Sequence, residues 1–221
     1  GILTVVDSVS GMFGNEMHVD EYQIDLLCGG SQKAVSAPPG LTFVTISDDA
    51  KKAMHERTTP VRSFYANLLT FDGYYEKKWF PYTMPISDIY GLAAAIDNIT
   101  VDSSLIGRTH KIAEATRYAL KEAGLHLHLE SGFSDTVTVF DIPMETTCNE
   151  ILMTMRNEHH IMLAGSFDDL SGKVIRIGHM GSNANFEDMM ATIVALSNTL
   201  TSLGVALKGN LAELFLKAYL N

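Results

Sequence analysis

Short apolar runs separated by polar turns occupy the first part of the chain. They fall at residues 2–6, 24–28 and 41–46. Runs of this length are typical of strands, and the first is expected to be a buried parallel strand because it lacks regular polar alternation. Ser47, which follows the third run, is expected to be the N-cap of a helix. Closely spaced strands followed by a helix predict a mixed or α/β sheet.

Residues 58–84 show neither a helical nor a strand pattern and are rich in aromatic side chains. The aromatic residues are Phe64, Tyr65, Phe71, Tyr74, Tyr75, Trp79, Phe80 and Tyr82. This composition indicates a buried interface or core packing, with the wall of a substrate channel as the alternative. The pattern becomes helical at 86–99 and again at 104–123, and Gly124 is a natural C-cap for the second helix.

Helices and strands then alternate to the end of the chain. The patterns predict strands at 125–129, 137–140, 160–164 and 174–177, and helices at 147–158, 185–203 and 211–220. In 125–129 leucine alternates with histidine, so His126 and His128 share one face of that strand. The alternation predicts a compact α+β domain, and we place a boundary near residue 100, between domains 1–100 and 101–221.

Composition narrows the class of protein. The 221 residues are 46% hydrophobic and 19% charged, which is ordinary for a globular protein. The net charge of −10 disfavours nucleic-acid binding, and no apolar run reaches the length of a membrane span. Cys28 and Cys148 lie far apart with no metal-ligand spacing. We therefore expect no zinc site and no disulfide framework, and a reducing compartment such as the cytoplasm.

The chain opens directly on an apolar strand pattern without a charged or polar lead-in. We expect from this that it is a fragment of something longer. A signal peptide is not indicated, because neither its charged start nor its cleavage site is present.

Lys33 is the first candidate for chemistry. It ends the run Gly29-Gly30-Ser31-Gln32-Lys33 after an apolar strand. A lysine amine attacks a carbonyl in its neutral form, which burial and nearby cations favour. The alternative is an ordinary surface lysine on a glycine loop. A nucleotide phosphate loop is excluded, because glycine must directly precede the lysine and Ser or Thr must follow it.

Asp7 is the second candidate. It lies at the expected carboxyl end of the first strand, where open α/β sheets bind ligands, although Asp also commonly caps turns. Asp7 and Lys33 together match what pyridoxal phosphate needs. The lysine forms a Schiff base, and the carboxylate keeps the pyridine nitrogen protonated.

Three consecutive blocks carry a specific resemblance. Residues 5–11 read Val-Val-Asp-Ser-Val-Ser-Gly, residues 19–25 read Val-Asp-Glu-Tyr-Gln-Ile-Asp, and residues 30–40 read Gly-Ser-Gln-Lys-Ala-Val-Ser-Ala-Pro-Pro-Gly. This pattern resembles the class V pyridoxal-phosphate aminotransferases, most closely the alanine–glyoxylate/serine–pyruvate branch. The resemblance continues through residues 83–85 and ends at 172–181. It implies a fold-type-I α/β protein, containing part of the large mixed-sheet domain and the small C-terminal α+β domain.

The resemblance implies a role for each matched cofactor residue. Lys33 would bind the cofactor and then carry the proton between the substrate α-carbon and the cofactor. Asp7 would pair with the pyridine nitrogen, and Val9 would pack against the ring. Gln32 would lie beside the phenolic oxygen or the phosphate, and Thr83 would reach the phosphate of the neighbouring subunit's cofactor.

Arg176 would bind the substrate α-carboxylate. It is the only charged residue in the apolar run 174–177, and its planar fork of donors suits a carboxylate. An edge-strand arginine pointing to solvent is the alternative. Two positions depart from the family pattern. Phe80 stands where the family often has a tyrosine, and the Tyr82 hydroxyl could take the place of the missing one. Gly165-Ser166 stands where the family commonly has a double glycine.

The function implied is transamination between a small amino acid of alanine or serine type and a 2-oxo acid such as glyoxylate or pyruvate, in a homodimer. Alternatives are an aminophosphonate or pyridoxamine transaminase, a lyase, or a catalytically incomplete fragment that acts only as a binding or structural piece. A desulfurase is disfavoured, because Cys28 lies in a strand and Cys148 begins a helix rather than a mobile loop. We expect no metal at His126 and His128, since no carboxylate or cysteine cluster joins them.

Overall fold

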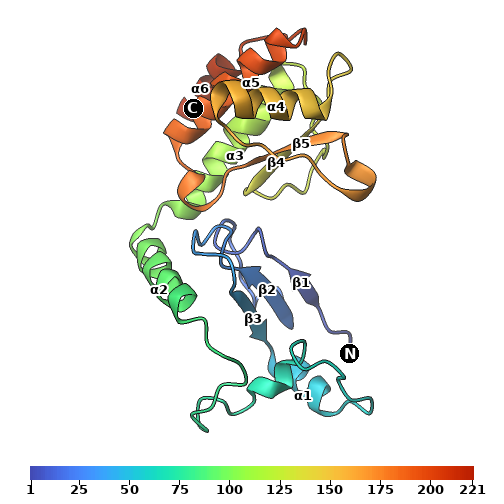
Figure 1. The fold of residues 1–221 in the computed structure, drawn as a ribbon, viewed down its shortest axis with the longest axis vertical. Coiled ribbons are helices and arrows are strands. Elements are labelled where there is room, and N and C mark those ends of the chain that lie inside the picture. The colour runs from blue at the N-terminus through green and yellow to red at the C-terminus, as the bar shows by residue number, and fades with distance from the viewer. The chain divides into compact units, whose positions relative to one another are not determined.

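The computed structural model describes residues 1–221, which divide into two compact units. The first contains Gly1–Met12 and Met17–Asn98, and the second contains Phe13–Glu16 and Ile99–Asn221. The division falls within one helix, so each unit is described by itself (Figure 1).

A three-stranded mixed sheet organises the first unit. Strand β1 (Val5–Asp7) pairs in parallel with β2 (Leu26–Gly30), which pairs antiparallel with β3 (Thr42–Ile46). Helix α1 (Asp48–His55) follows, and its N-cap is Ser47, whose hydroxyl accepts from the Ala50 amide at 3.0 Å. The mixed sheet and the N-cap confirm the sequence predictions.

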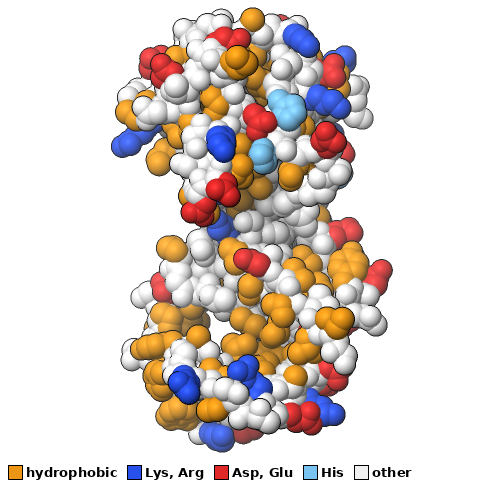
Figure 2. Space-filling model, turned by 90° about the vertical axis from the view of Figure 1, so that its right-hand side faces the viewer, with side chains coloured by type: hydrophobic (Ala, Val, Ile, Leu, Met, Phe, Trp, Pro, Cys, Tyr) orange, Lys and Arg blue, Asp and Glu red, His pale blue; other side chains and the backbone are white.

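The first strand is not buried as the sequence predicted. Val5 is 68% exposed and Ile2 96% exposed. The physical reason is its position: β1 is an edge strand with a single neighbour, β2, and no helix packs extensively against it, so its side chains stay exposed. Hydrophobic side chains gather on the surface of the first unit, while charges of both signs are scattered over the second (Figure 2).

The aromatic stretch is largely irregular, as predicted, with one 3₁₀ helix at Leu68–Phe71. Its rings contact one another edge to face: Phe71 lies 5.7 Å from Phe80 and 5.6 Å from Tyr82 between ring centroids. Helix α2 (Ile86–Val101) follows and spans the division between the units.

The second unit packs helices against a two-stranded sheet. Its helices are α3 (Leu105–Glu122), α4 (Cys148–His159), α5 (Phe186–Ser202) and α6 (Leu211–Leu220), and its antiparallel strands are β4 (Val137–Asp141) and β5 (Val174–Gly178). Two 3₁₀ helices cover Asp168–Leu170 and Gly181–Asn183. The apolar faces of the α-helices and of the two strands enclose one continuous core, which contains Phe140, Ile175, Leu196 and Phe215, all fully buried. Burial of such side chains is the main stabilising contribution to this unit.

Two predicted strands of this unit are wrong as regular strands. Residues 125–129 and 160–164 form only isolated bridges, Leu127 with Phe140 and Ala164 with Arg176. The helices begin and end within two residues of the predicted positions, and Gly124 has the left-handed φ of 89° expected of a C-cap.

Candidate active site

Asp7 and Lys33 lie at the same edge of the first sheet. Asp7 is the last residue of β1 and is in register with Cys28 of β2. Lys33 lies in the turn after β2 ends at Gly30. Because β1 and β2 are parallel, their carboxyl ends share one edge, which is where α/β sheets hold ligands.

The loop that carries Lys33 is folded tightly around a buried serine. The Ser31 hydroxyl donates to the Pro38 carbonyl at 2.6 Å and accepts from the Leu41 amide at 3.3 Å. The Ala37 amide donates to the Ser31 carbonyl at 2.9 Å. These bonds fix the backbone of the loop, while the Lys33 side chain is only half-buried.

Asp7 keeps a free carboxylate oxygen. Its Oδ1 accepts from the Val9 amide at 3.0 Å, and the side chain is otherwise exposed. Val9 is half-buried and Gln32 is exposed. A Cβ at the nearby Gly29 would lie 2.5 Å from the Met12 sulfur, so a larger residue there would require the flexible Met12 side chain to move.

The residues present fit pyridoxal phosphate. The cofactor has an aldehyde, which a lysine amine binds, and a pyridine nitrogen, which a carboxylate keeps protonated. The amine of Lys33 and the carboxylate of Asp7 supply this donor pair at one sheet edge.

Thr83 lies in the same unit but is not joined to this pair. It is exposed just before α2, and no hydrogen bond within the chain engages its hydroxyl. The neighbouring Tyr82 hydroxyl donates to the Phe64 carbonyl at 2.8 Å, so it is bound within the aromatic stretch.

Arg176 lies in the centre of β5 in the second unit. Its Nε donates to the Gly165 carbonyl at 2.6 Å, and its guanidinium lies 5.6 Å from the Phe167 ring centroid. Its two terminal nitrogens have no partner within the chain. Arg176 is therefore oriented by one nitrogen, and its two terminal nitrogens are open to donate to an anion such as a carboxylate.

A cleft of 590 Å³ opens beside Arg176. It is lined by Thr147, Cys148, Asn149, Leu152, Ala164, Gly165, Ser166, Phe167, Ser171, Gly172 and Arg176. Burial raises the pKa of the Cys148 thiol, so it stays protonated at neutral pH and is a poor nucleophile.

Sequence reasoning missed three contributors to this cleft. The Gly165 carbonyl orients Arg176, the Phe167 ring lies over it, and the Cys148 sulfur is 3.1 Å from where a Gly165 Cβ would be. The departure from a double glycine marked this segment, but nothing in the sequence indicates the contacts.

The histidine prediction needs a correction, because a carboxylate does join His126 and His128. Asp141 accepts from both Nδ1 atoms, at 2.6 and 2.8 Å. Hydrogen bonding to the two imidazoles lowers the Asp141 pKa, although burial opposes it most strongly. The structure contains no cluster of three or more His, Cys, Asp or Glu side chains placed to hold a metal.

His179 is fully buried and makes two hydrogen bonds. Its Nδ1 donates to the Asp135 carbonyl at 2.9 Å, and its Nε2 accepts from the Thr138 hydroxyl at 2.8 Å. Burial lowers its pKa to about 4, so it is neutral at physiological pH.

None of the helices has both the length and the apolar character that crossing a bilayer requires.

A solved structure of known function shares this architecture over nearly the whole chain. The solved structure of pyridoxamine–pyruvate aminotransferase from Mesorhizobium loti matches with a TM-score of 0.91 at 27% identity, over 99% of this chain and 57% of that one. The chain thus has part of the fold of the pyridoxal-phosphate-dependent aminotransferases.

The family follows from the sequence comparisons. The model of the family described as aminotransferase class V matches residues 1–185, and the chain belongs to that family. An uncharacterized aminotransferase of Methanocaldococcus jannaschii is 34% identical over 93% of this chain and 54% of its own length. The alanine–glyoxylate aminotransferase of Callithrix jacchus is 32% identical over 90% of this chain and 50% of its own length. The chain spans about half the length of these relatives, and their family depends on pyridoxal phosphate.

Proposed function

We propose that this chain is part of a pyridoxal-phosphate-dependent aminotransferase. It would transfer the amino group of a small amino acid of alanine or serine type to a 2-oxo acid such as glyoxylate or pyruvate. The observation that carries the proposal is that Asp7 and Lys33 both lie at one edge of the first sheet. The alanine–glyoxylate activity named for one relative supports the substrate class.

The first unit would be part of the large cofactor-binding domain, and the second the small domain. When bound, pyridoxal phosphate supplies a carbonyl for amines and an electron-withdrawing ring. Lys33 would hold the cofactor, and its amine would remove the substrate α-proton. Asp7 would hold a proton at the ring nitrogen, and Val9 would pack against the ring. Gln32 would lie beside the phenolic oxygen or the phosphate.

Arg176 binds the substrate carboxylate through its two open nitrogens. The Gly165 carbonyl fixes its third nitrogen, so the donor fork is oriented before substrate arrives. Such prior orientation reduces the entropy that binding would otherwise cost.

The functional assembly is a homodimer in this proposal, with Thr83 at the phosphate of the neighbouring subunit's cofactor. Exposed aromatic side chains at Tyr65, Tyr75 and Trp79 support an interface in the aromatic stretch. The free thiols of Cys28 and Cys148 support a reducing compartment such as the cytoplasm.

A pyridoxamine substrate is the second candidate, because a neighbour with a TM-score of 0.91 is a pyridoxamine–pyruvate aminotransferase. Arg176 alone does not decide between the two, because pyridoxamine has no carboxylate but the 2-oxo-acid acceptor of either reaction does. A screen of alanine, serine and pyridoxamine as donors, against glyoxylate and pyruvate, decides between them.

The cofactor attachment is tested by borohydride reduction of the protein with pyridoxal phosphate, followed by peptide mapping. We expect the label on Lys33 and its loss in Lys33→Ala. The control is Lys52→Ala, which replaces an exposed lysine on α1 and should leave the label on Lys33. A label on any other lysine overturns the assignment.

The substrate role of Arg176 predicts the effect of Arg176→Lys. The charge remains but two-point binding and the bond to Gly165 are lost, so kcat/KM for the amino acid should fall about 10- to 100-fold. Arg156→Lys, on an exposed turn of α4, is the control. Steady-state kinetics measures both, and an unchanged kcat/KM in Arg176→Lys would contradict the role.

A further inference from the structure

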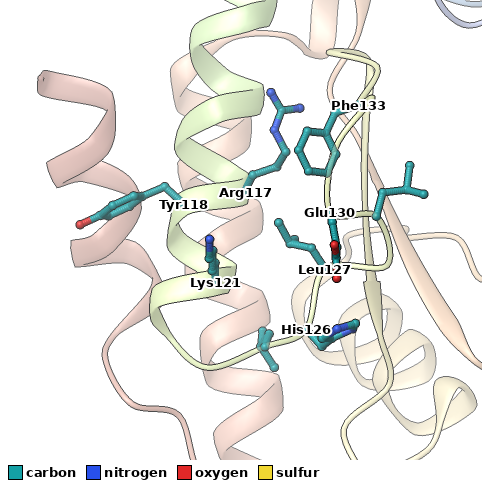
Figure 3. Close-up of a pocket in the computed structure, with 9 residues that line it drawn as sticks. Arg117, Tyr118, Lys121, His126, Leu127, Glu130 and Phe133 are labelled. Carbon is teal, nitrogen blue, oxygen red and sulfur yellow. The ribbon is translucent and has the colours of Figure 1, made fainter.

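A second cleft lies in the second unit, between α3 and the segment 125–133 (Figure 3). It has a volume of 530 Å³. Its lining consists of Arg117, Tyr118, Lys121, Leu125, His126, Leu127, Leu129, Glu130 and Phe133. None of these residues lines the Arg176 cleft or belongs to the Asp7–Lys33 edge.

The floor of the cleft is apolar and fixed. Leu125, Leu127 and Leu129 line it at alternate positions of one segment. That segment is tied to β4, because the His128 amide donates to Val139 at 3.0 Å and the Asp141 amide to His126 at 2.9 Å. The apolar floor therefore exists before any ligand binds.

One wall is fixed by a chain of charged contacts. The Arg117 guanidinium lies 4.8 Å from the Phe133 ring centroid and donates to Asp135 at 2.9 Å. His110 donates to the same carboxylate at 2.7 Å. Arg117 is thus neutralised within the protein, and its role here is to hold Phe133 in place.

Two opposite charges in the cleft are unpaired. Lys121 extends from α3 and Glu130 from the segment across from it, while Tyr118 points to the other side of α3 (Figure 3). Both charged side chains are exposed, and no hydrogen bond or ion pair within the chain engages either. The cleft therefore offers one cation, one anion and an apolar floor.

We propose that this cleft binds a free amino acid with an apolar side chain. Its carboxylate pairs with Lys121, its ammonium group with Glu130, and its side chain covers the leucines and Phe133. An apolar acid or amine would satisfy only one of the two charges, whereas an amino acid satisfies both. The site is separate from the substrate site and does not depend on the proposed transamination.

Calorimetric titration of the whole chain with L-leucine tests the proposal, with 4-methylpentanoate and L-leucinamide as probes that lack one charged group each. We expect L-leucine to bind at least about fivefold more tightly than either probe. Lys121→Met and Glu130→Gln should each weaken leucine binding by about fivefold or more. Lys111→Met and Glu122→Gln, on the same helix but outside the cleft, should leave it unchanged.

Two further variants separate this site from the proposed active site. Leucine binding should persist in Lys33→Ala and Arg176→Met, which would remove cofactor attachment and substrate binding. Loss of leucine binding in Arg176→Met, equal binding of 4-methylpentanoate, or no detectable heat with L-leucine would each overturn the proposal.

Discussion

At the scale of single residues, the position of Arg176 depends on a main-chain atom and its surroundings. The Gly165 carbonyl accepts from Arg176, and a Cβ on Gly165 would lie 3.1 Å from the Cys148 sulfur. A contact this short must push the neighbours apart. Cys148 therefore limits the size of the side chain that position 165 can carry without a shift.

Gly165→Ala tests this coupling. We expect it to raise the KM for the amino-acid substrate about tenfold, because the carbonyl shifts and Arg176 loses its orientation. The double variant Gly165→Ala/Cys148→Ala should recover most of the affinity, since the smaller side chain makes room for the added methyl group. A double variant no better than the single one would show that the sulfur is not the obstacle.

His179 predicts how stability depends on pH. Burial lowers its pKa to about 4, below the ordinary histidine value, so between those two values the unfolded chain holds a proton that the folded chain does not. Stability should therefore fall as pH decreases from about 6.5 towards 4, by about 3 kcal/mol from this group alone.

Urea unfolding of the protein and of His179→Asn across that pH range measures the contribution. The variant keeps a donor for the Asp135 carbonyl and should lose most of the slope. His159→Asn, at the end of α4, should keep it. Equal slopes in the protein and His179→Asn would contradict the assignment.

Sequence reasoning found the candidate side chains whose chemistry is unusual for their setting. The sequence showed three such residues: Lys33 after a glycine pair, Asp7 at a strand end and Arg176 in an apolar strand. Gly165, Phe167 and the Asp141 link between the histidines were not, because they act through contacts between segments distant in sequence.

At the scale of elements, periodicity predicted the helices well and the strand ends poorly. The run 125–129 alternates as a strand should, and its three leucines line one cleft together with His126. It nevertheless forms only a bridge, at Leu127. Alternation decides which side chains share a face, but the length of a ladder depends on the partner strand, which local sequence does not reveal.

The start of α4 is fixed by local contacts between two side chains and the backbone. The Thr147 hydroxyl accepts from the Glu150 amide at 3.3 Å, and the Glu150 carboxylate accepts from the Thr147 amide at 2.8 Å. This reciprocal pair is a capping box. It fixes the beginning of the helix on which Cys148 is the first residue.

Thr147→Ala should lower the free energy of unfolding by about 1 kcal/mol, because the helix loses its cap. Thr154→Ala in the middle of the same helix removes the same atoms without touching the cap and should have little effect or a small stabilising one. Chemical denaturation measures both. Equal losses in the two variants would show that the cap contributes nothing specific.

At the scale of the whole molecule, the two units differ in how completely they are buried. The second has a continuous core of fully buried side chains. Many large apolar side chains of the first are exposed, among them Phe64, Tyr75 and Trp79. Exposed apolar surface of this extent is typical of regions that other protein surfaces cover.

We therefore expect residues 99–221 expressed alone to fold, with dispersed amide signals in NMR and cooperative thermal unfolding. Residues 1–98 alone should aggregate or remain poorly ordered. Asn15, which accepts from the Ser134 hydroxyl at 3.1 Å, would be missing from the second unit, so a modest loss of stability is expected. Collapsed, undispersed spectra from 99–221 would refute its independence.

The bond between Arg176 and Gly165 has an evolutionary consequence. A peptide oxygen is present whatever side chains flank it, so the orientation of Arg176 and the carboxylate binding proposed for it do not depend on the identity of Ala164 or Ser166. Substitutions there can reshape the space offered to the rest of a bound molecule while anion recognition persists. Ligand preference can thus change among descendants of one ancestor while the Arg176–Gly165 hydrogen bond is kept.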